Sequence, residues 1–387
     1  MNIVFFSHPT FLGSLSMLRY VKWLADGMKK RGHNVQIWIP EPKFFNLPVS
    51  KNLKKWLGYI DQFIIFRFWV RNQIRKQPAD TLYVFTDHAM GPWVPLVKRK
   101  LHVIHCHDFL AQFSAMGKIP ENPISWSGRK YQTYIRNGFR KSRNFISISE
   151  KTRQDLHLLL DIRPEVSEVV YNGLTRPYRP AENVDSILLH LKKITKIDLS
   201  QGYILHVGGN QWNKNRKGVI EIYNKWREIF NKTLPLLMIG PFPDEELIKV
   251  FAASPYNNTI HFLTDKTDEF VGLAYQGASA FVFPSLAEGF GWPIAESMAS
   301  GTPVVTTKEA PMTEVAGNAA LFIERRPTRE EKVADWAAAS AMVIETLLSY
   351  DEQERLRLTE KGLHNVKRFD NEKTIEKIEN IYKSILR

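Results

Sequence analysis

The alternation of short hydrophobic strands with amphipathic helical segments is the feature that most limits the folds open to this chain. Strand-like segments in the first half are NIVFFS, NVQIWIP, TLYVFT, HVIHC and NFISIS, and in the second half YILHVGG, LPLLMIG, NTIHFL, SAFVFPS and TPVVTT. Helical patterns separate them, as where Leu18, Val21 and Leu24 recur on one side before Gly32. Strands that alternate with helices predict parallel sheets covered on both faces. The chain is therefore expected to be an α/β protein built from Rossmann-like, doubly wound domains.

The length of 387 residues suits two such domains. Residues 173–201 are less regular, and TRPYRPAENVD within them is expected to connect the domains. We therefore predict an N-terminal domain at residues 1–180 and a second domain at 181–370, facing each other across a cleft. The amphipathic segment 371–387, NEKTIEKIENIYKSILR, is expected to be a terminal helix.

Cysteine content and hydropathy favour the cytoplasm. The single cysteine, Cys106, rules out an internal disulfide and a cysteine-based zinc site. No apolar run approaches the roughly 18 to 20 residues that span a bilayer. The first residues, MNIVFFSHPTF, have neither a basic start nor a cleavage site, so they are expected to form a core strand and not a signal peptide.

Positive charge is concentrated in the first half of the chain. Residues 1–180 carry 28 lysines and arginines against 12 acidic residues, whereas residues 181–387 carry 25 against 28. A basic domain joined to a nearly neutral one indicates that the first domain faces something anionic. No nucleic-acid recognition motif accompanies this charge, so we expect no nucleic-acid partner.

The stretch SLAEGFGWPIAESMASGTPVV, residues 285–305, predicts a ligand site. A buried strand precedes it, Pro293 suits the first position of a helix, and Glu296 is expected in the first helical turn. Glu288 lies at the carboxyl end of the strand, which is where ligands bind in open α/β sheets. Gly289 and Gly291 allow a ligand to approach the backbone and the helix N-terminus.

This stretch resembles the EGFG...E signature of the GT-B-fold retaining glycosyltransferases of family 4 (group 1). Other segments fall in the order expected for that family: RYVKWLADGMKKRGHNVQIW, SISEKTRQDL, VVYNGL, YILHVGGN, KNRKGVIEIY, LMIGPFPDEEL and APMTEVAGNAALFI. The resemblance covers nearly the whole chain, and the EGFG...E stretch is its most specific part. It implies a GT-B fold, a nucleotide-sugar donor and retention of anomeric configuration without a metal or other cofactor. It also implies that the helix 371–387 crosses back to the N-terminal domain.

The resemblance assigns the donor to residues on both sides of the glycine turn. Glu288 is implied to lie beside the donor sugar, the amides of Phe290 and Gly291 to contact sugar hydroxyls or the diphosphate, and Glu296 to accept hydrogen bonds from the ribose. A carboxylate can accept from both hydroxyls of a diol. Gly13, in PTFLGSL, matches a glycine turn that approaches the diphosphate.

The diphosphate of such a donor needs positive charge, and NQWNKNRKG supplies Lys214, Arg216 and Lys217 directly after a strand. We expect phosphate contact chiefly from Lys214 and Arg216, since the domain has no net positive charge to spare. The family commonly places an arginine directly after VG, where this chain has Gly209. An alignment shifted by three residues would give Lys217 the role of Lys214.

Histidines end one strand of the first domain. His105 and His107 in VIHCHDF share a face of the strand, but no third residue at metal-ligand spacing accompanies them. The resemblance places His107 near the reacting end of the donor, which leaves His105 as a packed, hydrogen-bonded residue. Asp87 and His88, which end YVFTDH, are expected on the acceptor side.

Together these patterns predict a hexosyltransferase that uses a UDP- or GDP-sugar, with His107, Glu288, Lys214 and Arg216 at the reacting centre. No Asp-x-Asp motif for a metal-bound diphosphate occurs. A dinucleotide-dependent oxidoreductase would need G-x-G-x-x-G after the first strand, and that motif is absent. A sugar-nucleotide epimerase remains the alternative within the fold.

Residues 43–76 are rich in aromatic and basic side chains and suggest where the acceptor comes from. Trp56, Ile60, Phe63, Ile64 and Trp69 would share one broad helical face, accompanied by Lys51, Lys54, Lys55, Arg67, Arg71 and Arg75. A core helix with solvated lysines would have the same pattern. The charge of the domain favours an anionic membrane surface, since such lipid attracts each basic residue by about 1 kcal/mol. We therefore expect a cytoplasmic enzyme, peripheral on the inner face of the membrane, that glycosylates a lipid-linked saccharide of the cell envelope; the alternative is a small soluble acceptor.

Overall fold

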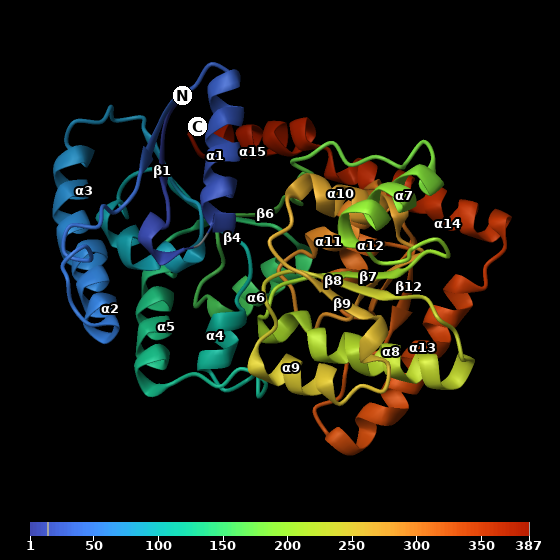
Figure 1. Ribbon diagram of the computed structural model, residues 1–387. Coiled ribbons are helices and arrows are strands. Elements are labelled where there is room, and N and C mark those ends of the chain that lie inside the picture. The colour runs from blue at the N-terminus through green and yellow to red at the C-terminus, as the bar shows by residue number, and fades with distance from the viewer. Residues whose placement is uncertain (14, 387) are drawn as a thin grey trace. The chain divides into compact units, whose positions relative to one another are not determined.

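A computed structural model describes residues 1–13 and 15–386 of the chain (Figure 1). The chain forms two compact units: unit 1 contains residues 1–175 and 371–387, and unit 2 contains residues 176–370. The division falls after Thr175, a few residues before the boundary at 180 that the sequence suggests. The C-terminal segment is thus part of the first unit.

Unit 1 is built on a sheet of parallel strands in the order β2-β1-β3-β4-β5-β6. These strands are β1 (Asn2–Phe6), β2 (Asn34–Trp38), β3 (Leu82–Phe85), β4 (His102–Cys106), β5 (Asn144–Ser147) and β6 (Val166–Val169). Every residue of β3 and β4 is buried, as expected for central strands covered by helices on both faces.

Helices and turns of unit 1 connect these strands. They are η1 (Thr10–Leu12), α1 (Leu15–Lys30), α2 (Lys51–Ile60), the π-helix η2 (Asp61–Ile65), α3 (Phe66–Ile74), η3 (His88–Leu96), α4 (Leu110–Ala115), α5 (Trp126–Phe139), α6 (Glu150–Leu159) and α15 (Asn371–Ile385). The terminal helix α15 packs on α1, where a Cβ added to Gly27 would lie 2.8 Å from the Ile375 side chain. A larger residue at position 27 would force the Ile375 side chain to shift.

Unit 2 repeats the design with a second parallel sheet in the order β12-β11-β10-β7-β8-β9. Its strands are β7 (Ile204–Val207), β8 (Leu236–Ile239), β9 (Ile260–Leu263), β10 (Ala280–Phe283), β11 (Val304–Thr307) and β12 (Ala320–Ile323). Its helices are α7 (Val184–Thr195), η4 (Trp212–Lys214), α8 (Arg216–Phe230), α9 (Glu245–Ala252), η5 (Asn257–Thr259), α10 (Asp268–Gly277), α11 (Trp292–Ala299), α12 (Met312–Ala316), η6 (Glu330–Lys332), α13 (Val333–Leu348), α14 (Glu352–Asn365) and η7 (Val366–Phe369).

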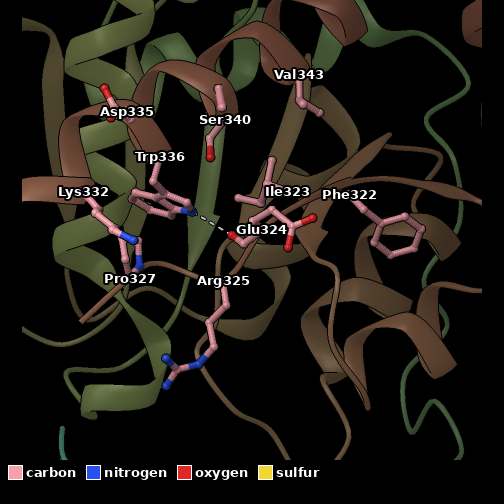
Figure 2. A pocket seen from close by; sticks show the side chains of 11 residues that line it. Phe322, Ile323, Glu324, Arg325, Pro327, Lys332, Asp335, Trp336, Ser340 and Val343 are labelled. Atoms are coloured by element: carbon pink, nitrogen blue, oxygen red, sulfur yellow. Dashed lines mark hydrogen bonds between the residues drawn. The ribbon is translucent and has the colours of Figure 1, made fainter. Parts of the chain in front are cut away.

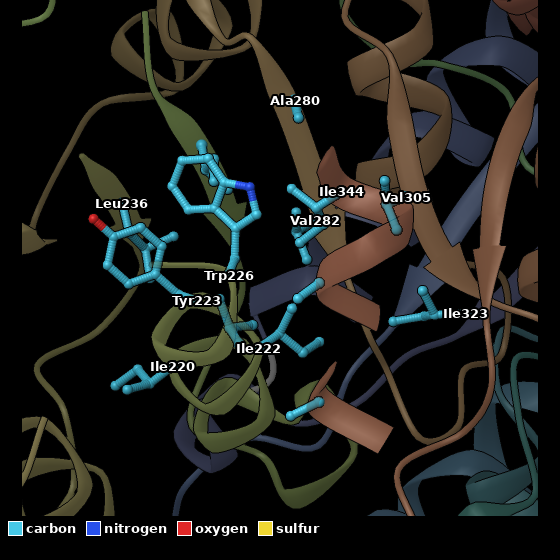
Figure 3. Packing of buried hydrophobic residues seen from close by; sticks show 14 of the residues in the cluster. Ile220, Ile222, Tyr223, Trp226, Leu236, Ala280, Val282, Val305, Ile323 and Ile344 are labelled. Atoms are coloured by element: carbon cyan, nitrogen blue, oxygen red, sulfur yellow. The ribbon is translucent and has the colours of Figure 1, made fainter. Parts of the chain in front are cut away.

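The core of unit 2 fills the space between this sheet, α8 and α13 (Figure 3). Trp226 of α8 is its largest fully buried side chain, and its indole nitrogen donates a 2.9 Å hydrogen bond to Glu345 of α13. Aliphatic side chains of β10 and β11, including Val282 and Val305, meet Ile344 of α13 in the same cluster. Helix α8 is thereby held rigidly, which fixes the residues at its N-terminus.

Each sheet has one place where the order of strand addition reverses. In unit 1 the chain places β2 on one side of β1 and β3 on the other, so the reversal lies between β1 and β3. In unit 2 it lies between β7 and β10. Loops that leave the carboxyl ends of such a strand pair diverge to opposite faces, and the crevice between them is where α/β sheets bind ligands.

No helix in residues 1–13 and 15–386 is long and apolar enough to cross a membrane.

Candidate active site

Lys214 and Glu288 form an ion pair at the switch point of unit 2. Lys214 ends the turn η4, which follows β7, and Glu288 lies in the loop that follows β10. The Lys214 Nζ lies 2.8 Å from Oε1 and 2.9 Å from Oε2 of Glu288, and 5.4 Å from the centre of the Phe283 ring. The Glu288 side chain is only 8% exposed. Two residues predicted from distant parts of the sequence are therefore in direct contact.

Two asparagines flanking Lys214 hold the loop that carries Glu288. Asn213 Nδ2 donates to the carbonyl of Ala287 at 2.8 Å, and Asn215 Nδ2 donates to the carbonyl of Pro284 at 2.8 Å. Asn215 has a φ of 50°, a left-handed conformation that asparagine tolerates better than most residues, and its side chain also caps α8. Sequence reasoning missed both residues, although Asn-Lys-Asn before a helix was a usable signal.

Ser285 orients the Glu288 carboxylate. Its hydroxyl lies 2.6 Å from Oε1 of Glu288 and 2.6 Å from the carbonyl oxygen of Asn213, and both oxygens can accept its hydrogen. Ser285 is fully buried. The sequence analysis used it only as the boundary of a strand, and its contact with Glu288 depends on the fold.

Arg216 opens α8 with a buried guanidinium. The residue is 5% exposed, and its Nη1 donates to the carbonyl of Pro241 at 3.1 Å and also bonds to the side chain of Asn210. The guanidinium lies over the Phe262 ring at 5.4 Å. Within the described chain, Nε and Nη2 have no hydrogen-bond partner, and burial lowers the pKa of the group. Buried donors without acceptors are costly, so two nitrogens are available for an anion.

Lys217 does not join this group. Its Nζ lies 3.6 Å from carboxylate oxygens of Glu246 and Glu330, both of which are largely exposed. Three cations are expected near the diphosphate. The structure places Lys214 beside Glu288 and Lys217 among surface charges, and it buries Arg216 at the start of α8 with two donors free within the described chain. Gly209 lies in the loop after β7, where an added Cβ would come within 2.3 Å of the Gln211 side chain.

The turn between Glu288 and α11 presents backbone to a ligand. Phe290 is 4% exposed because its ring packs edge-on against Phe369, with 5.3 Å between the ring centres. Gly291 has a φ of 101°, which side chains rarely allow, and Gly289 is partly exposed. A ligand at this turn would meet main-chain groups and not the aromatic ring.

Glu296 lies in the second turn of α11, which corrects the expectation that it lies in the first. Helix α11 begins at Trp292, one residue before Pro293. Burial raises the pKa of Glu296, although hydrogen bonds from Tyr275 and Tyr178 oppose the effect. The Tyr275 hydroxyl is 3.1 Å from Oε2. Sequence reasoning missed both tyrosines, because neither lies near the EGFG turn in the chain.

The carboxyl ends of β1 and β4 in unit 1 carry two more predicted site residues. Gly13 caps η1 with a φ of 73°, and no atom lies within 4 Å of a Cβ built there, so a ligand can approach its backbone. His107 follows β4, and its Nε2 donates to the carbonyl of Thr86 at 2.9 Å, which leaves Nδ1 as the acceptor. Burial lowers the pKa of His107 and favours the neutral ring.

His105 is a structural residue, as the sequence analysis expects. It is completely buried, and its Nδ1 and Nε2 lie 2.8 Å from the Tyr20 hydroxyl and 2.7 Å from the Tyr382 hydroxyl. Burial, with His107 nearby, lowers its pKa to about 3. Among the described residues, no group of three His, Cys, Asp or Glu side chains is arranged to hold a metal ion.

Asp87 lies between two histidines at the switch point of unit 1. Its Oδ2 is 2.8 Å from His8 Nε2, and its Oδ1 is 2.8 Å from His88 Nδ1. Burial alone would raise the pKa of Asp87, but the two imidazoles hold it well below its usual range. Burial opposes the charge on His88 as well, yet the Asp87 carboxylate raises the pKa of that ring. Sequence reasoning missed His8, which follows β1.

A separate pocket of about 620 Å³ lies between the end of β12 and α13 (Figure 2). Its lining includes Phe322, Lys332, Trp336 and Val343, and the Trp336 indole donates to the Glu324 carbonyl at 2.7 Å. It contains none of the predicted site residues. We therefore do not assign this pocket as the catalytic site, despite its size.

The fold corresponds to that of a known class of enzyme. The structure of HepE from Anabaena in complex with UDP and glucose superimposes with a TM-score of 0.73 at 16% identity, covering 99% of this chain and 100% of that one. Two parallel six-stranded units of this kind define the GT-B fold of glycosyltransferases. The predicted fold class is thus confirmed.

Matches to two family models cover most of the chain. Residues 17–175 match the model "Glycosyltransferase Family 4", and residues 201–345 match "Glycosyl transferases group 1". The chain belongs to the family 4 (group 1) glycosyltransferases, and it is an enzyme of that class. This membership sets aside the epimerase alternative.

Two curated relatives are mannosyltransferases. O-antigen chain mannosyltransferase B of Escherichia coli is 31% identical over 185 residues, which is 47% of this chain and 46% of the relative. The O-antigen chain mannosyltransferase RfbU of Salmonella typhimurium is 21% identical over 302 residues, covering 77% of this chain and 74% of the relative. The match thus spans less than half the length of the first relative.

Proposed function

We propose that this chain is a retaining, metal-independent hexosyltransferase that transfers mannose from a GDP- or UDP-activated donor to a lipid-linked saccharide of the cell envelope. The observation that carries the proposal is the Lys214–Glu288 pair at the switch point, with the free donors of Arg216 two residues further along the chain, at the start of α8. The names of the two mannosyltransferase relatives supply the sugar and the class of acceptor.

The chemistry of a nucleotide-sugar donor suits this arrangement. When the bond between the anomeric carbon and the diphosphate breaks, negative charge grows on the diphosphate. Preorganised cations in a water-poor site stabilise such charge best. Lys214 and the two free donors of Arg216 supply that stabilisation in this proposal, and the Glu288 carboxylate keeps Lys214 in place. Glu296 binds the ribose.

A donor screen tests the proposal directly. Purified enzyme is incubated with GDP-mannose and with UDP-, GDP- and ADP-linked control sugars, with and without a lipid-linked saccharide extracted from envelope membranes. We expect transfer from one mannose or hexose donor, with the product keeping the donor's anomeric configuration by NMR, and full activity in the presence of EDTA. Transfer only to soluble acceptors would contradict the lipid-linked acceptor, and loss of activity in EDTA would contradict metal independence.

Replacing Glu296 by alanine is expected to weaken nucleotide binding by roughly 1.5–3 kcal/mol, the scale of hydrogen bonds to a charged group. Calorimetry with GDP and UDP measures the change, and thermal unfolding checks that the variant is folded. Tyr275→Phe removes one hydroxyl that holds the Glu296 carboxylate. It should lose less nucleotide affinity than Glu296→Ala. Unchanged affinity in a folded Glu296→Ala variant would contradict the assignment.

The raised pKa of Glu296 also predicts how nucleotide binding depends on pH. The ionised carboxylate is the form that accepts from two ribose hydroxyls, so affinity should be complete above the pKa of Glu296 and fall as pH drops through it. Because that pKa is raised, the fall occurs at a higher pH than for an ordinary glutamate. Glu296→Gln should remove this pH dependence of nucleotide affinity. Identical pH profiles for variant and wild type would contradict the prediction.

The helical segment α2–η2–α3 provides the surface that we assign to the membrane. Trp56 and Phe68 are 60% and 61% exposed, and Leu53, Ile64 and Trp69 are also exposed. Lys55 and Arg71 lie over the rings of Tyr59 and Phe68 at 6.0 and 5.7 Å. Phe63, in contrast, is partly buried and packs against the rings of Tyr131 and Tyr134. The Lys51 side chain lies outside the described residues. Exposed aromatic rings next to cations are typical of residues that insert at a charged lipid surface.

Vesicle co-sedimentation checks the membrane assignment. Binding should require anionic lipid and decline as salt rises through the range where screening acts. The double variant Lys55→Glu/Arg71→Glu should lose most of the binding, since each basic residue near the surface contributes about 1 kcal/mol. Lys193→Glu, on α7 of unit 2, is the matched control. A protein that ignores anionic vesicles at low salt would have a soluble acceptor instead.

A further inference from the structure

A second pocket of unit 2, of about 490 Å³, is lined mostly by basic side chains, and the proposed function does not use it. One wall is formed by α14 and the turn η7, and the other includes Asn318, in the connection between α12 and β12. Asn318 precedes β12, at the amino edge of the parallel sheet, whereas Lys214 and Glu288 follow the carboxyl ends of β7 and β10. The pocket is therefore separate from the candidate active site.

The basic side chains of this pocket form one stripe along α14 and η7. The stripe consists of Arg357, Lys361, His364 and Arg368. These residues recur every three or four positions, which places them on one face of a helix. Among the residues that line the pocket, Glu360 is the only acidic one. The pocket thus concentrates positive charge in the half of the chain that has no excess of it, since residues 181–387 carry 25 lysines and arginines against 28 acidic residues.

Most of the stripe is exposed and able to bind a ligand. Within the part of the chain that the structure describes, no side-chain hydrogen bond or ion pair engages Arg357, Lys361 or His364. Arg368, in contrast, is held in place. Its Nη2 donates to the carbonyl of Glu314 at 2.7 Å, and its guanidinium lies 5.0 Å from the centre of the Phe369 ring. One fixed guanidinium is thus accompanied by cations whose donors are not engaged by the protein.

Buried polar contacts join the two walls of the pocket. Asn365 is 7% exposed, and its Nδ2 donates to the carbonyl of Val315 at 2.7 Å. Gly317 has a φ of 58°, and a Cβ added there would lie 2.9 Å from Oδ1 of Asn365. A side chain at position 317 would therefore be strained and would crowd Asn365. The shape of the pocket is fixed by the fold of unit 2 and does not depend on a ligand.

We propose that this pocket binds the phosphate group of a ligand, at a site separate from the donor site. Guanidinium groups donate two parallel hydrogen bonds to phosphate oxygens, and lysine adds a point charge. A concave surface lined by charge of one sign also attracts counter-ions. Small-molecule sites have volumes of roughly 300–1,000 Å³, so this pocket suits a phosphorylated small molecule or the phosphate headgroup of a lipid. The inference does not depend on the proposed function.

The larger pocket beside Trp336 lacks this chemistry. Its two cations, Arg325 and Lys332, are matched by the carboxylates of Glu324 and Asp335 (Figure 2). Its charges therefore balance, whereas those of the smaller pocket do not. An anionic ligand is thus expected only at the stripe on α14 and η7.

Calorimetric titration with inorganic diphosphate tests the site. The double variant Arg357→Ala/Lys361→Ala should weaken one class of diphosphate site by about 10-fold for each charged hydrogen bond that is lost. Glu360→Gln removes the opposing charge and should tighten diphosphate binding, which a general loss of stability does not do. The donor site would bind diphosphate as well, and Lys214→Ala should weaken that class of site alone. Lys249→Ala, an exposed position of α9 outside the pocket, is the control, and thermal unfolding checks that each variant is folded.

Vesicle co-sedimentation separates the two sources of the phosphate group. With vesicles of phosphatidylcholine and phosphatidylglycerol, weaker binding by the double variant than by wild type would identify a lipid headgroup, and equal binding would identify a soluble molecule. Either result agrees with the proposal. Equal diphosphate binding by wild type and the double variant overturns it, and so does weaker diphosphate binding by Glu360→Gln. A chain that binds diphosphate in this pocket but transfers no sugar would overturn the proposed function and leave this inference intact.

Discussion

Lys214→Ala is expected to lower kcat by about 10²-fold, the scale found when a preorganised group that stabilises a leaving anion is removed. The physical reason is that the departing diphosphate loses its ammonium partner. KM for the nucleotide sugar should rise less, because charge on the diphosphate increases as the bond breaks. Steady-state kinetics with the donor identified in the screen measure both. Near-normal kcat in a folded variant would remove Lys214 from the reacting centre.

Because Lys214 contacts Glu288, a second variant is needed to interpret the kinetics of Lys214→Ala. Lys214→Ala leaves the Glu288 carboxylate, 8% exposed, without its cation, so the single variant should also unfold more easily. The double variant Lys214→Ala/Glu288→Gln removes the stranded charge and should recover stability without recovering turnover. A double-mutant cycle thereby separates the structural part of the ion pair from its catalytic part.

Lys217 and Lys225, two lysines of α8, provide comparisons. Lys217→Ala should cost much less turnover than Lys214→Ala, because Lys217 lies between exposed carboxylates of Glu246 and Glu330. Lys225→Ala removes an exposed pair with Glu228 on the same helix and serves as the control. A larger loss for Lys217 than for Lys214 would show that the shifted alignment is the correct one.

The parts of the fold that sequence predicts well are the ones with the strongest hydrophobic pattern. Central strands such as β3 and β10 are buried on both faces, so their segments, LYVF and AFVF, appear as unbroken apolar runs. The strands β6 and β12, at one edge of each sheet, were not predicted, whereas β2 and β9 at the opposite edges were. The segments of β6 and β12, VSEV and ALFI, are partly exposed. Helix α7 was also missed in the segment expected to be irregular, although Asn183 caps it.

The residues of the candidate site also fall into those that the sequence predicts and those that it does not. Glu288 and Lys214 were predictable because each follows a recognisable strand, and the strands of a parallel sheet direct their ends to one edge. Ser285, Asn213 and Tyr178 were not, because their importance depends on contacts between segments far apart in the chain. The sequence also left the role of Lys217 open, because residues 214 and 217 are equally basic. Where α8 begins decides which of the two lysines faces Glu288.

Removal of residues 371–387 is expected to abolish both solubility and activity, because α15 is part of the core of unit 1. Ile375, Ile378 and Tyr382 are buried against a cluster that includes Leu24 of α1. Deletion would expose that apolar face of α1 and leave His105 of β4, two residues before His107, without the Tyr382 hydroxyl. Soluble yield and transfer activity measure the result, and a fully active truncated enzyme would contradict it.

A point substitution gives the same test in a protein that still folds. Ile378→Ala should lower the free energy of unfolding by about 2–5 kcal/mol, the usual cost of truncating a buried isoleucine. Denaturant unfolding followed by circular dichroism measures it. Glu376→Ala, on the exposed face of the same helix, should change stability by less than about 0.5 kcal/mol. Equal effects of the two substitutions would mean that α15 does not pack on α1 in solution, and the segment would then be dispensable for the stability of unit 1.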